Sequence, residues 1–525
     1  MPETAAEAPP LSEIAAKGPP PRLGRPLPLR VAFAGERARA LLAAGVEAQP
    51  ELAEGCDLLV AGDDAGPEGA RLAERARSMG IPVVALAAGG EPAPAADVVA
   101  GDVPAGPSSV PTAPPVDVRA FNPSGFRAAG VAGYLAASRP PARLEAVAAA
   151  LGSFGQAARL EPVVLRTPPE ARPDYFPSGV APSSELDAPP AELLEIVHRR
   201  LGVIDHPALH ASDFERAGWI ARLCAAGVPT VAQDPSPRLE LLLGAELAAA
   251  LAAVGPRELA DLDERERVSV RLRRAALRTL SLDAAWRRIA AAAGLEVPER
   301  PLVSVILATR RQEWLEHGLG QVARQTYEPR ELIVALHGDG FSAGVEERLR
   351  ELVSGPLKVV RVDGELTLGD ALNAGVAVAA GECVTKMDDD DYYDRDHIWD
   401  LVLALEYSGA DLVGKAAEFV YLEEIDVTIR QISSDAETRL AGGGMMVRRE
   451  PLVELNGWPL RTRGEDLALI RRFQNHGRSI HRIPPHGYIL NRHGRGHTWR
   501  PAVDYFLFRS DRQWRGLRFD ATGIA

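Results

Sequence analysis

The feature that most constrains the fold of this chain is an alternation of short apolar runs and amphipathic stretches in its C-terminal half. Short apolar runs bounded by turn residues are typical of strands that are buried on both faces, and the stretches between them have the apolar spacing of helices. The runs occupy 302–309, 331–337, 357–362 and 382–387, and the helical stretches occupy 313–325, 344–353 and 368–380. Because strands that alternate with helices form parallel sheets with crossover helices, we expect an α/β domain over residues 300–525.

The N-terminal half shows the same alternation less regularly. Apolar runs at 29–35, 57–62 and 81–87 predict strands, and residues 66–80 predict a helix between the last two. An Ala/Pro/Gly-rich stretch at 88–118 predicts a loop or linker. We therefore expect a disordered tail at 1–27, a Rossmann-like α/β region at 28–255 that is open to division into 28–118 and 119–255, a charged helical connector at 256–299, and the α/β domain at 300–525.

Composition limits the class of partner. The chain has 59 Lys and Arg against 72 Asp and Glu, a formal net charge of −13. Proteins that bind nucleic acid through its phosphates need a basic surface, so we expect no nucleic-acid partner. No apolar run is long enough to span a bilayer, so we expect no transmembrane segment, and peripheral membrane contact stays open.

The N-terminus and the cysteines bear on the compartment. The first residues lack the basic start and apolar core of a signal peptide, and the three cysteines are far apart without metal-ligand spacing. Both features favour a cytoplasmic protein with reduced thiols. The frequent Ala, Arg and Pro residues are typical of a GC-rich bacterial genome.

Four consecutive aspartates, at 388–391, directly follow the last of the predicted strands. In open α/β sheets the carboxyl ends of the strands are where ligands bind. Carboxylate oxygens are the ligands that Mg²⁺ and Mn²⁺ prefer, and such an ion would neutralise the cluster while holding a diphosphate. The run by itself is equally compatible with a solvated acidic turn that caps the helix expected near Arg395. Its place at the end of a strand favours a Mn²⁺ or Mg²⁺ site.

Glu465 and Asp466 open another predicted helix, which has apolar positions at Leu467, Ile470 and Phe473. Acids in a first helical turn often do no more than favour the helix dipole. A carboxylate that projects from a helix start into a cleft is also suited to be a general base. The helix start alone favours the first interpretation.

Glycines and histidines give two weaker signals. Gly442, Gly443 and Gly444 precede a predicted strand, where they would form a bulge or let the backbone approach a ligand closely. His493 and His497 lie in a basic segment near the C-terminus. A neutral histidine can ligate a metal, but a lone histidine usually does not.

The order of these motifs resembles that of the family 2 glycosyltransferases, which are inverting enzymes of the GT-A fold. The family's opening strand V-S-V-I-I-P-T-Y-N corresponds to residues 303–311, and its Q-T-Y to 325–327. Its N-x-G helix, G-E turn and D-x-D-D run correspond to Asn373, Gly375, 381–382 and 388–391. Its glycine-rich loop with the R-R strand, its N-G-W turn and its E-D helix correspond to 442–449, 456–458 and 465–466. The resemblance covers residues 302–525.

The resemblance implies an enzyme that moves a sugar from a nucleotide-diphosphate sugar to an acceptor hydroxyl with inversion. It implies Asp466 as the general base with Glu465 in support, and a Mn²⁺ or Mg²⁺ ion at Asp388 and Asp390, with His493 or His497 as a further ligand. The residues that it implies at the donor are Thr309, Arg310, His337, Asp339, Asn373, Asp388 and Asp389, and those at the acceptor are Gly443, Gly444, Met445 and Trp458. The acceptor stays open among a carbohydrate, a glycolipid and a small molecule.

Two positions depart from the family pattern. The family often ends its second strand in D-D-G-S, where the first aspartate helps to read the nucleotide base, and this chain has Leu336-His337-Gly338-Asp339 instead. We expect His337 or Asp339 to substitute for that aspartate, which leaves the base of the donor open. The opening strand ends in Arg310-Arg311 in place of the family's Tyr-Asn.

The N-terminal half resembles more loosely the Rossmann-like halves of GT-B glycosyltransferases, through the segment 206–234, which predicts a helix, a glycine stop and a short strand. Two rival functions stay open for the chain. A nucleotidyltransferase would be expected to show a glycine-rich basic loop after the first strand, where residues 309–311 are basic but contain no glycine. A non-catalytic carbohydrate-binding or scaffold protein would not need Asp466.

Overall fold

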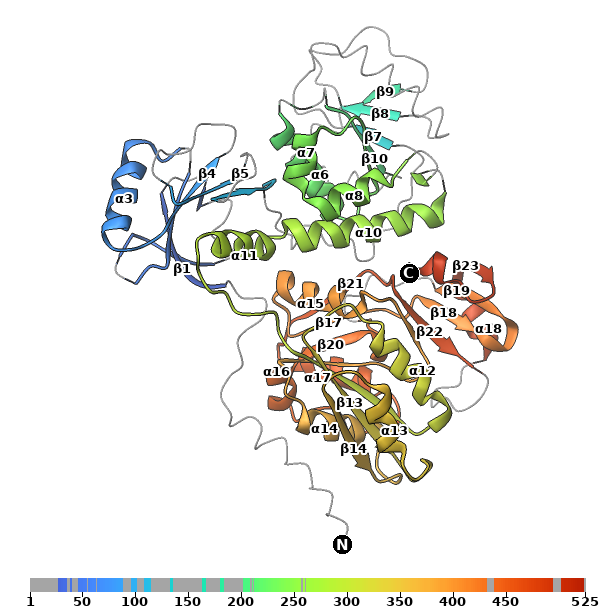
Figure 1. The fold of residues 1–525 in the computed structure, drawn as a ribbon. Helices are drawn as coiled ribbons and strands as arrows, with labels where there is room; N and C mark the ends of the chain where they lie inside the picture. The colour runs from blue at the N-terminus through green and yellow to red at the C-terminus, as the bar shows by residue number, and fades with distance from the viewer. Residues whose placement is uncertain are drawn as a thin grey trace. The chain divides into compact units, whose positions relative to one another are not determined.

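The computed structural model divides the chain into two compact units, residues 25–298 and residues 299–525 (Figure 1). The structure describes residues 27–34, 38–39, 46–53, 55–62, 64–87, 96–101, 108–114, 133–135, 163–166, 180–183, 202–207, 210, 212–255, 258–259, 261–431, 439–493 and 502–523. The predicted tail lies outside these residues except for Leu27, which begins the first strand.

The first sheet of the N-terminal unit has six parallel strands in the order β2-β1-β3-β4-β5-β6. They are β1 (Leu27–Ala34), β2 (Val46–Gln49), β3 (Leu58–Ala61), β4 (Val83–Ala87), β5 (Val98–Gly101) and β6 (Ser109–Pro111), and helix α3 (Gly66–Ser78) connects β3 to β4. The three predicted strands and the helix are confirmed. The prediction of a loop at 88–118 is wrong in part, because β5 and β6 lie within it. Their three or four residues among Ala, Pro and Gly are too short to stand out as a period.

The second sheet of this unit has five parallel strands in the order β11-β10-β7-β8-β9. They are β7 (Gly133–Leu135), β8 (Val163–Arg166), β9 (Val180–Ser183), β10 (Gly202–Asp205) and β11 (Thr230–Ala232). Helix α6 (Asp213–Ala225) ends just before Gly227, which has a φ of 72°, and β11 follows. The predicted helix, glycine stop and strand are therefore confirmed.

Residues expected to form a helical connector make two helices, α10 (Leu262–Leu280) and α11 (Leu282–Ala292). Ser281 caps α11 by accepting a hydrogen bond from the backbone N–H of Ala284. Trp286 and Ile289 of α11 are buried in the core of the first sheet. Helix α10 packs instead on two helices that accompany the second sheet, α6 and α8 (Ala245–Ala252). The short helix α7 (Pro237–Leu243) precedes α8 in the chain. The two helices thus belong to the core of this unit.

The C-terminal unit is built on a seven-stranded mixed sheet in the order β14-β13-β12-β15-β20-β17-β21. The strands are β12 (Val303–Thr309), β13 (Arg330–His337), β14 (Leu357–Val362), β15 (Cys383–Lys386), β17 (Leu412–Lys415), β20 (Met445–Arg448) and β21 (Ile480–Ile483). The first four are mutually parallel, and β20 runs antiparallel to both β15 and β17. Each predicted strand of this domain is present to within a residue or two, and the predicted α/β fold class is confirmed.

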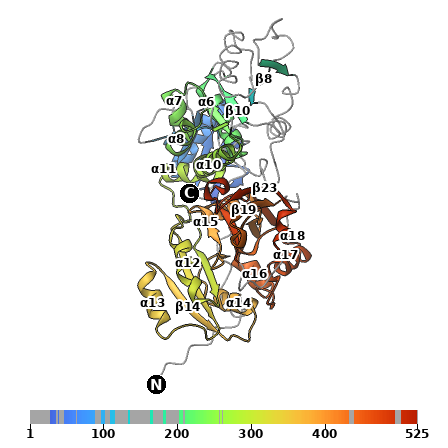
Figure 2. The same ribbon diagram turned by 90° about the vertical axis from the view of Figure 1, so that its right-hand side faces the viewer.

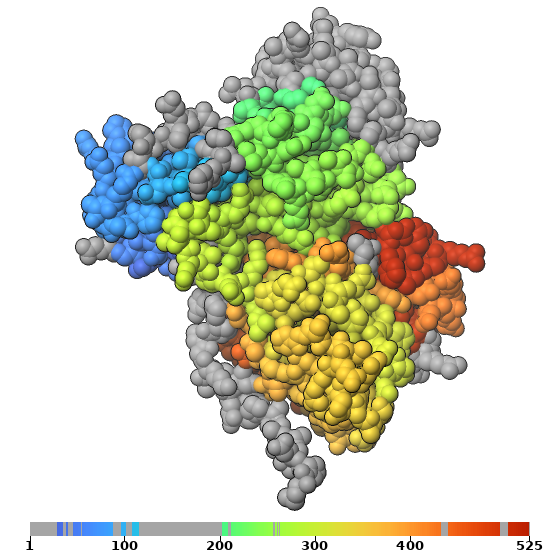
Figure 3. All heavy atoms as spheres, viewed as in Figure 1, coloured from blue at the N-terminus to red at the C-terminus, as the bar shows by residue number. Residues whose placement is uncertain are grey.

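Helices cover both faces of this sheet (Figures 1 and 2). Helices α12 (Gln312–Ala323), α13 (Val345–Leu352) and α15 (His397–Ser408) contribute to one core cluster with the sheet. Helices α14 (Leu368–Val378), α16 (Arg449–Glu454) and α17 (Glu465–Asn475) contribute to the other. Figure 3 shows the face of this unit that its first half forms, in yellow to orange. Of the apolar residues of α17, Leu467 is exposed, whereas Leu469, Ile470 and Phe473 are buried in the core.

The C-terminal unit also has a smaller, five-stranded sheet, whose first strand follows the aspartate run directly in the sequence. Its order is β16-β22-β18-β19-β23, with strands β16 (Tyr392–Tyr393), β18 (Phe419–Leu422), β19 (Val427–Gln431), β22 (Tyr488–Arg492) and β23 (Ser510–Arg515) and the short helices α18 (Val503–Leu507) and α19 (Phe519–Thr522). Strand β16 begins directly after Asp391 and pairs with β22, which ends directly before His493. This pairing is what brings His493 to the aspartates.

Within the described residues, the structure contains no helix with the length and apolar character needed to cross a bilayer.

Candidate active site

The ends of three adjacent parallel strands meet at one edge of the large sheet. Strand β12 ends at Thr309, β13 at His337 and β15 at Lys386. Strand β12 lies between the other two, with Thr309 opposite Leu336. Because the carboxyl edge of an open α/β sheet is its usual ligand side, this edge is the candidate site. It brings together the predicted residues at 309–310, at 337–339 and in the aspartate run.

Asp391 is the most enclosed of the four aspartates, with 1% of its surface exposed. The hydroxyl of Tyr488 donates to its Oδ2 at 2.7 Å, and the backbone N–H of Asn491 donates to its Oδ1 at 2.9 Å. Burial, with the neighbouring Asp390 and Asp388, raises the pKa of Asp391 well above its ordinary value. Asp391 therefore anchors the end of β15 to β22.

Asp389 ties the end of β15 to the end of β12. Its carboxylate accepts a hydrogen bond from Thr309 Oγ1 and forms an ion pair with Arg311, whose Nε also lies 3.3 Å from Asp389 Oδ2. Burial raises the pKa of Asp389, although Arg311 acts in the opposite direction. Thr309 was expected at the donor, but its hydroxyl donates to an aspartate of the protein.

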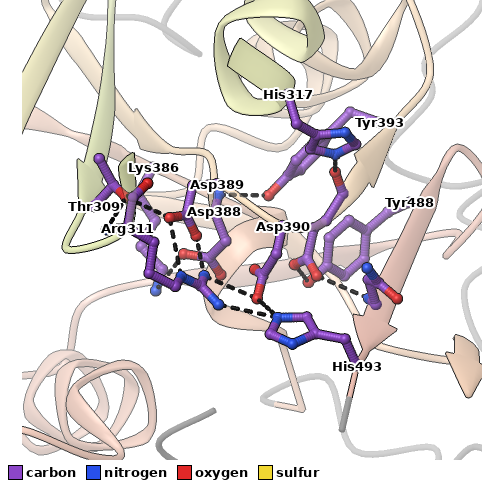
Figure 4. Close-up of polar contacts among 12 residues, drawn as sticks. Thr309, Arg311, His317, Lys386, Asp388, Asp389, Asp390, Tyr393, Tyr488 and His493 are labelled. Carbon is purple, nitrogen blue, oxygen red and sulfur yellow. Dashed lines mark hydrogen bonds and ion pairs between the residues drawn. The ribbon is translucent and has the colours of Figure 1, made fainter. Parts of the chain in front are cut away.

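Asp390 lies between two cationic or hydrogen-bonding side chains (Figure 4). Its Oδ2 is 2.9 Å from Arg311 Nη2 and 2.8 Å from His493 Nε2. Arg311 Nη1 lies 3.0 Å from the same histidine nitrogen, and the ring of Trp314 stacks on that of His493 at 4.9 Å between centroids. Burial alone would lower the pKa of Arg311, but Asp389 and Asp390 raise it above its ordinary value.

Asp388 differs from the other three because about a third of its side chain, 35%, is exposed. Its Oδ1 lies 3.2 Å from Lys386 Nζ, and its backbone N–H donates to the hydroxyl oxygen of Tyr393 at 2.7 Å. Asp388 is thus the carboxylate of the run that is open to a ligand.

Lys386 connects the aspartate run to the start of α17. Its ammonium group is buried and lies 3.1 Å from Glu465 Oε1. Burial would lower the pKa of Lys386, but Asp388, Glu465 and Asp466 together raise it above its ordinary value. Glu465 is itself buried, so this ion pair fixes the first turn of α17 beside the strand edge.

Asp466 is partly exposed, and its Oδ1 accepts a hydrogen bond from the backbone N–H of Leu467 at 2.7 Å. Burial raises the pKa of Asp466, while Lys386 lowers it, and the net direction is upward. A raised pKa makes a carboxylate a better proton acceptor near neutral pH.

The glycine-rich turn (Gly442–Gly444) lies between Asp388 and Asp466. A Cβ atom at Gly442 would lie 3.2 Å from Asp466 Oδ2 and 3.0 Å from Lys386 Nζ. A Cβ atom at Gly443 would lie 2.9 Å from Asp388 Oδ2 and 2.6 Å from Tyr393 Oη. The two partly exposed carboxylates therefore lie on either side of a backbone that has no room for side chains.

His337 and Arg310 form a second group at the same edge. Arg310 Nε donates to His337 Nδ1 at 3.1 Å, and Arg310 Nη2 donates to the carbonyls of Gly364 and Leu366 at 2.7 and 3.0 Å. Burial and then the charge of Arg310 lower the pKa of His337. Asp339 follows on the exposed loop after β13.

Other predicted site residues lie away from this edge or are enclosed in the core. Asn373 exchanges two hydrogen bonds with the backbone of Trp458, at 2.7 and 2.9 Å, and the side chain of Trp458 is buried in the core. Met445 is buried in the same core, and Gly444 packs against Lys415. The structure therefore does not bring the side chains of Asn373, Met445 and Trp458 to the carboxylates, and Gly444 has no side chain to contribute.

Some of the predicted metal ligands lie next to each other in the structure, and one of them cannot be placed. Asp390 and His493 are adjacent, whereas His497 lies outside the described residues. Nowhere in the described part of the chain do three His, Cys, Asp or Glu side chains form a ligand set for a metal ion. The cations nearest to the run are Arg311 and Lys386, and neither was assigned a role from the sequence. Lys386 could have been noticed as a lysine in an otherwise apolar strand that leads into four acids.

A mixed sheet of this order with acids at its carboxyl edge is the GT-A class of transferase fold that the sequence pattern predicts. Residues 304–452 match the model of the family described as glycosyl transferase family 2. The expected resemblance is confirmed over that range, and the C-terminal unit contains a domain of this family.

One curated relative is the uncharacterized glycosyltransferase YwdF of Bacillus subtilis (strain 168), which is 32% identical over 132 residues. The match covers 25% of this chain and 47% of that relative, so the chain spans about half the relative's length.

Two solved structures are similar to part of the chain. The mannosyltransferase PcManGT from Pyrobaculum calidifontis, in complex with GDP-Man and Mn²⁺, is 21% identical, with a TM-score of 0.30 over 38% of this chain and 59% of that one. S. aureus TarS 1–349, in complex with UDP-GlcNAc, is 17% identical, with a TM-score of 0.30 over 39% of this chain and 63% of that one. The assignment of the fold therefore depends on the strand order of this chain and not on these two likenesses.

Proposed function

We propose that the C-terminal unit transfers a sugar from a nucleotide-diphosphate sugar to an acceptor hydroxyl with inversion, and that Asp466 is the general base. The observation that carries this proposal is the placement of Asp388 and Asp466. These two carboxylates are partly exposed and flank the glycine-rich turn, while the other acids of the cluster are enclosed by partners. The family 2 match over 304–452 supports a nucleotide-sugar donor.

In this proposal Asp466 receives the proton of the acceptor hydroxyl. The hydroxyl oxygen forms its bond to the anomeric carbon while the bond from that carbon to the diphosphate oxygen breaks on the opposite face. The raised pKa of Asp466 supports this role, since a carboxylate matched more closely to neutral pH accepts a proton more readily. Glu465 cannot share the proton freely, because its carboxylate is held by Lys386.

A divalent ion fits the described residues in part. Mg²⁺ typically takes one or two protein carboxylates and fills its remaining positions with water and substrate phosphates. Asp388, Asp390 and His493 would hold Mn²⁺ or Mg²⁺ here, and Arg311 would have to release Asp390. When bound, the ion would stabilise the charge that develops on the leaving diphosphate.

The donor's nucleotide would lie along the edge that runs from Asp388 toward His337. Arg310 and His337 are held together beside the carbonyls of 364 and 366, and Asp339 is exposed next to them. We propose these side chains for contact with the nucleotide. Thr309 and Asp389 would act indirectly, since they bond to each other.

We also propose that residues 28–255 are a pair of Rossmann-like domains of the GT-B kind. The second sheet supports this, because β8 and β9 extend it on one side of β7 while β10 and β11 extend it on the other, as in a doubly wound fold. The packing of α11 on the first sheet and of α10 on the second joins the two.

The test of the enzymatic proposal is slow hydrolysis of the donor. The full chain is incubated with Mn²⁺ and a panel of nucleotide sugars, and release of nucleoside diphosphate is measured. We expect release from at least one donor and a loss of 10²–10⁴-fold in Asp466→Asn. The control is Glu316→Gln, which removes an exposed carboxylate on α12. No release from any donor contradicts the transferase proposal, and full activity in Asp466→Asn contradicts the assignment of the base.

A further inference from the structure

A hollow in the surface of the C-terminal unit lies on the outer side of α17. Its volume is about 380 Å³, and it lies between that helix and the turn at 459–461. The polar side chains that line it are Arg461, Arg471, Arg472, Asn475 and His476, with Leu460 at the rim. Positions 468, 471, 472 and 475 of α17 contribute to it, which is the spacing of one helix face. Figure 2 shows α17 beside α16 at the surface of the unit.

The lining is positively charged, with three arginines and no aspartate or glutamate. Arg472 is fixed in the wall, because its Nη1 donates to the carbonyls of Leu455 at 2.8 Å and Gly457 at 2.9 Å. Burial lowers the pKa of Arg472, and the nearby charge of Arg461 lowers it further. Two guanidinium groups are therefore close enough to repel each other.

The other two arginines are exposed, and their side chains make no hydrogen bond or ion pair to any described residue. Acids are available to pair with arginines in this chain, whose net charge is −13. Arg478, which follows on the same segment, pairs with Glu454, and Arg350 on α13 pairs with Glu346 and Glu347. An uncompensated cluster around a hollow is the arrangement that an anionic ligand would stabilise.

We propose that this hollow, the arginine pocket, binds a phosphate group. Guanidinium groups bind phosphate oxygens through pairs of parallel hydrogen bonds, and Arg461 and Arg471 have all their donors available to a ligand. The volume of the pocket is within the range of small-molecule sites and exceeds that of one phosphate, so a sugar or glycerol unit attached to the phosphate also fits.

This inference rests on the proposed function for its biological meaning. Helix α17 carries the proposed base, Asp466, in its first turn, and the arginine pocket lies on the opposite face of the same helix. A helix with its side chains is about 10 Å across. Because a ligand that reaches both sites must pass around the helix, it is an elongated acceptor whose phosphate group lies more than about 10 Å from the hydroxyl that attacks. The pocket thus gives the acceptor a chemical class, a phosphate-bearing molecule.

Binding is tested with inorganic phosphate and glycerol 3-phosphate as probes and glycerol as the neutral control, by calorimetry on the full chain. The variant is Arg461→Gln/Arg471→Gln, and the matched control is Arg348→Gln/Arg350→Gln on α13, where both arginines are exposed. We expect the double pocket variant to bind glycerol 3-phosphate at least tenfold more weakly, with an unchanged melting temperature, and the control to bind it as the wild type does. Absent binding, or equal binding in the pocket variant, overturns the proposal.

Transfer assays test whether the phosphate that the pocket binds belongs to the acceptor or is a phosphate that takes no part in transfer. With a donor that the wild type hydrolyses, we expect faster transfer to a long-chain ω-hydroxyalkyl phosphate, which is long enough to reach from the pocket to Asp466, than to the matching diol, and loss of this preference in the pocket variant. Equal transfer to both acceptors overturns the acceptor role while leaving donor hydrolysis, and with it the proposed function, intact. If the wild type hydrolyses no donor but binds glycerol 3-phosphate through the pocket, the proposed function fails and the phosphate site stands.

Discussion

Replacing Arg311 by Met removes the guanidinium group that compensates two enclosed carboxylates. Arg311 forms ion pairs with Asp389 and Asp390, whose side chains are 5% and 9% exposed, while its own side chain is 23% exposed. Methionine keeps most of the aliphatic volume, so the change is chiefly one of charge. The two acids would be left beside Thr309 and His493 without a full positive charge between them.

Removing one partner of a buried ion pair costs about 3–5 kcal/mol, because the other charge stays buried without compensation. The lower end applies here, since Arg311 is partly exposed and each aspartate keeps one other hydrogen-bonding partner. A loss of about 3 kcal/mol corresponds to a fall of roughly 6–12 °C in the melting temperature of a unit of this size. Arg348→Met, which changes an exposed arginine on α13, should cost less than about 1 kcal/mol.

The pH dependence of the deficit follows from the carboxylates. The pKa of Asp389 is raised by burial even when Arg311 is present, and removal of Arg311 raises it further. A group with a raised folded-state pKa favours the folded state at low pH and loses that contribution as pH rises through its pKa. The deficit of Arg311→Met should therefore be largest at neutral pH and should shrink as the solution is acidified.

The assay is thermal unfolding of the full chain at neutral and mildly acidic pH, with and without Mn²⁺. If Asp390 binds the ion as proposed, a hundredfold excess over its dissociation constant would restore about 2.7 kcal/mol. A variant as stable as the wild type at neutral pH would refute the reasoning about compensation. A normal deficit that Mn²⁺ does not reduce would contradict the metal site instead.

Three further outcomes are expected. Gly443→Ala should lower stability by about 1–3 kcal/mol and impair donor hydrolysis, because the new Cβ would overlap the hydroxyl of Tyr393 and the carboxylate of Asp388. The control Gly320→Ala on α12 places its Cβ in open space and should change neither property. Tyr488→Phe should lower the free energy of unfolding, measured in urea, by about 1–3 kcal/mol at neutral pH and by less in acid, because it removes a hydrogen-bond donor to the ionised form of Asp391. An equal loss at both pH values would contradict this. The acid limb of the pH profile of donor hydrolysis should lie above the ordinary aspartate pKa of about 3.9, because burial raises the pKa of Asp466, and a limb that persists in Asp466→Asn would assign it to another group.

Much of the C-terminal fold could be predicted because its signals are local. The apolar run at 357–362 became a strand with the same bounds, and the first turn of α17 begins at Glu465 as the pattern indicated. Strand and helix periods are properties of neighbouring residues, so they are legible in one sequence. Strands β5 and β6 could not be predicted, because strands of three or four residues in an Ala/Pro/Gly-rich stretch give no period.

The orientation of side chains within predicted elements was less accessible. Leu467 fits the apolar spacing of α17 as well as Leu469 does, but only the packing of the helix on the sheet decides which is buried. Trp458 and Met445 matched positions of an acceptor site in the resembling family, yet both side chains fill the core. A motif gives the place of a residue in the chain and not the direction of its side chain.

The sequence by itself determined that this chain has an α/β domain in its C-terminal half, that four aspartates follow a buried strand of that domain, and that two acids begin a later helix. Only the tertiary structure decided what each acid does. Asp391 and Asp389 are enclosed by partners on distant strands, Asp390 is shared by Arg311 and His493, which are 182 residues apart, and Asp388 is open. The physical reason is that the state of a carboxylate depends on its burial and on the charges around it, and both come from segments that meet only when the chain has folded.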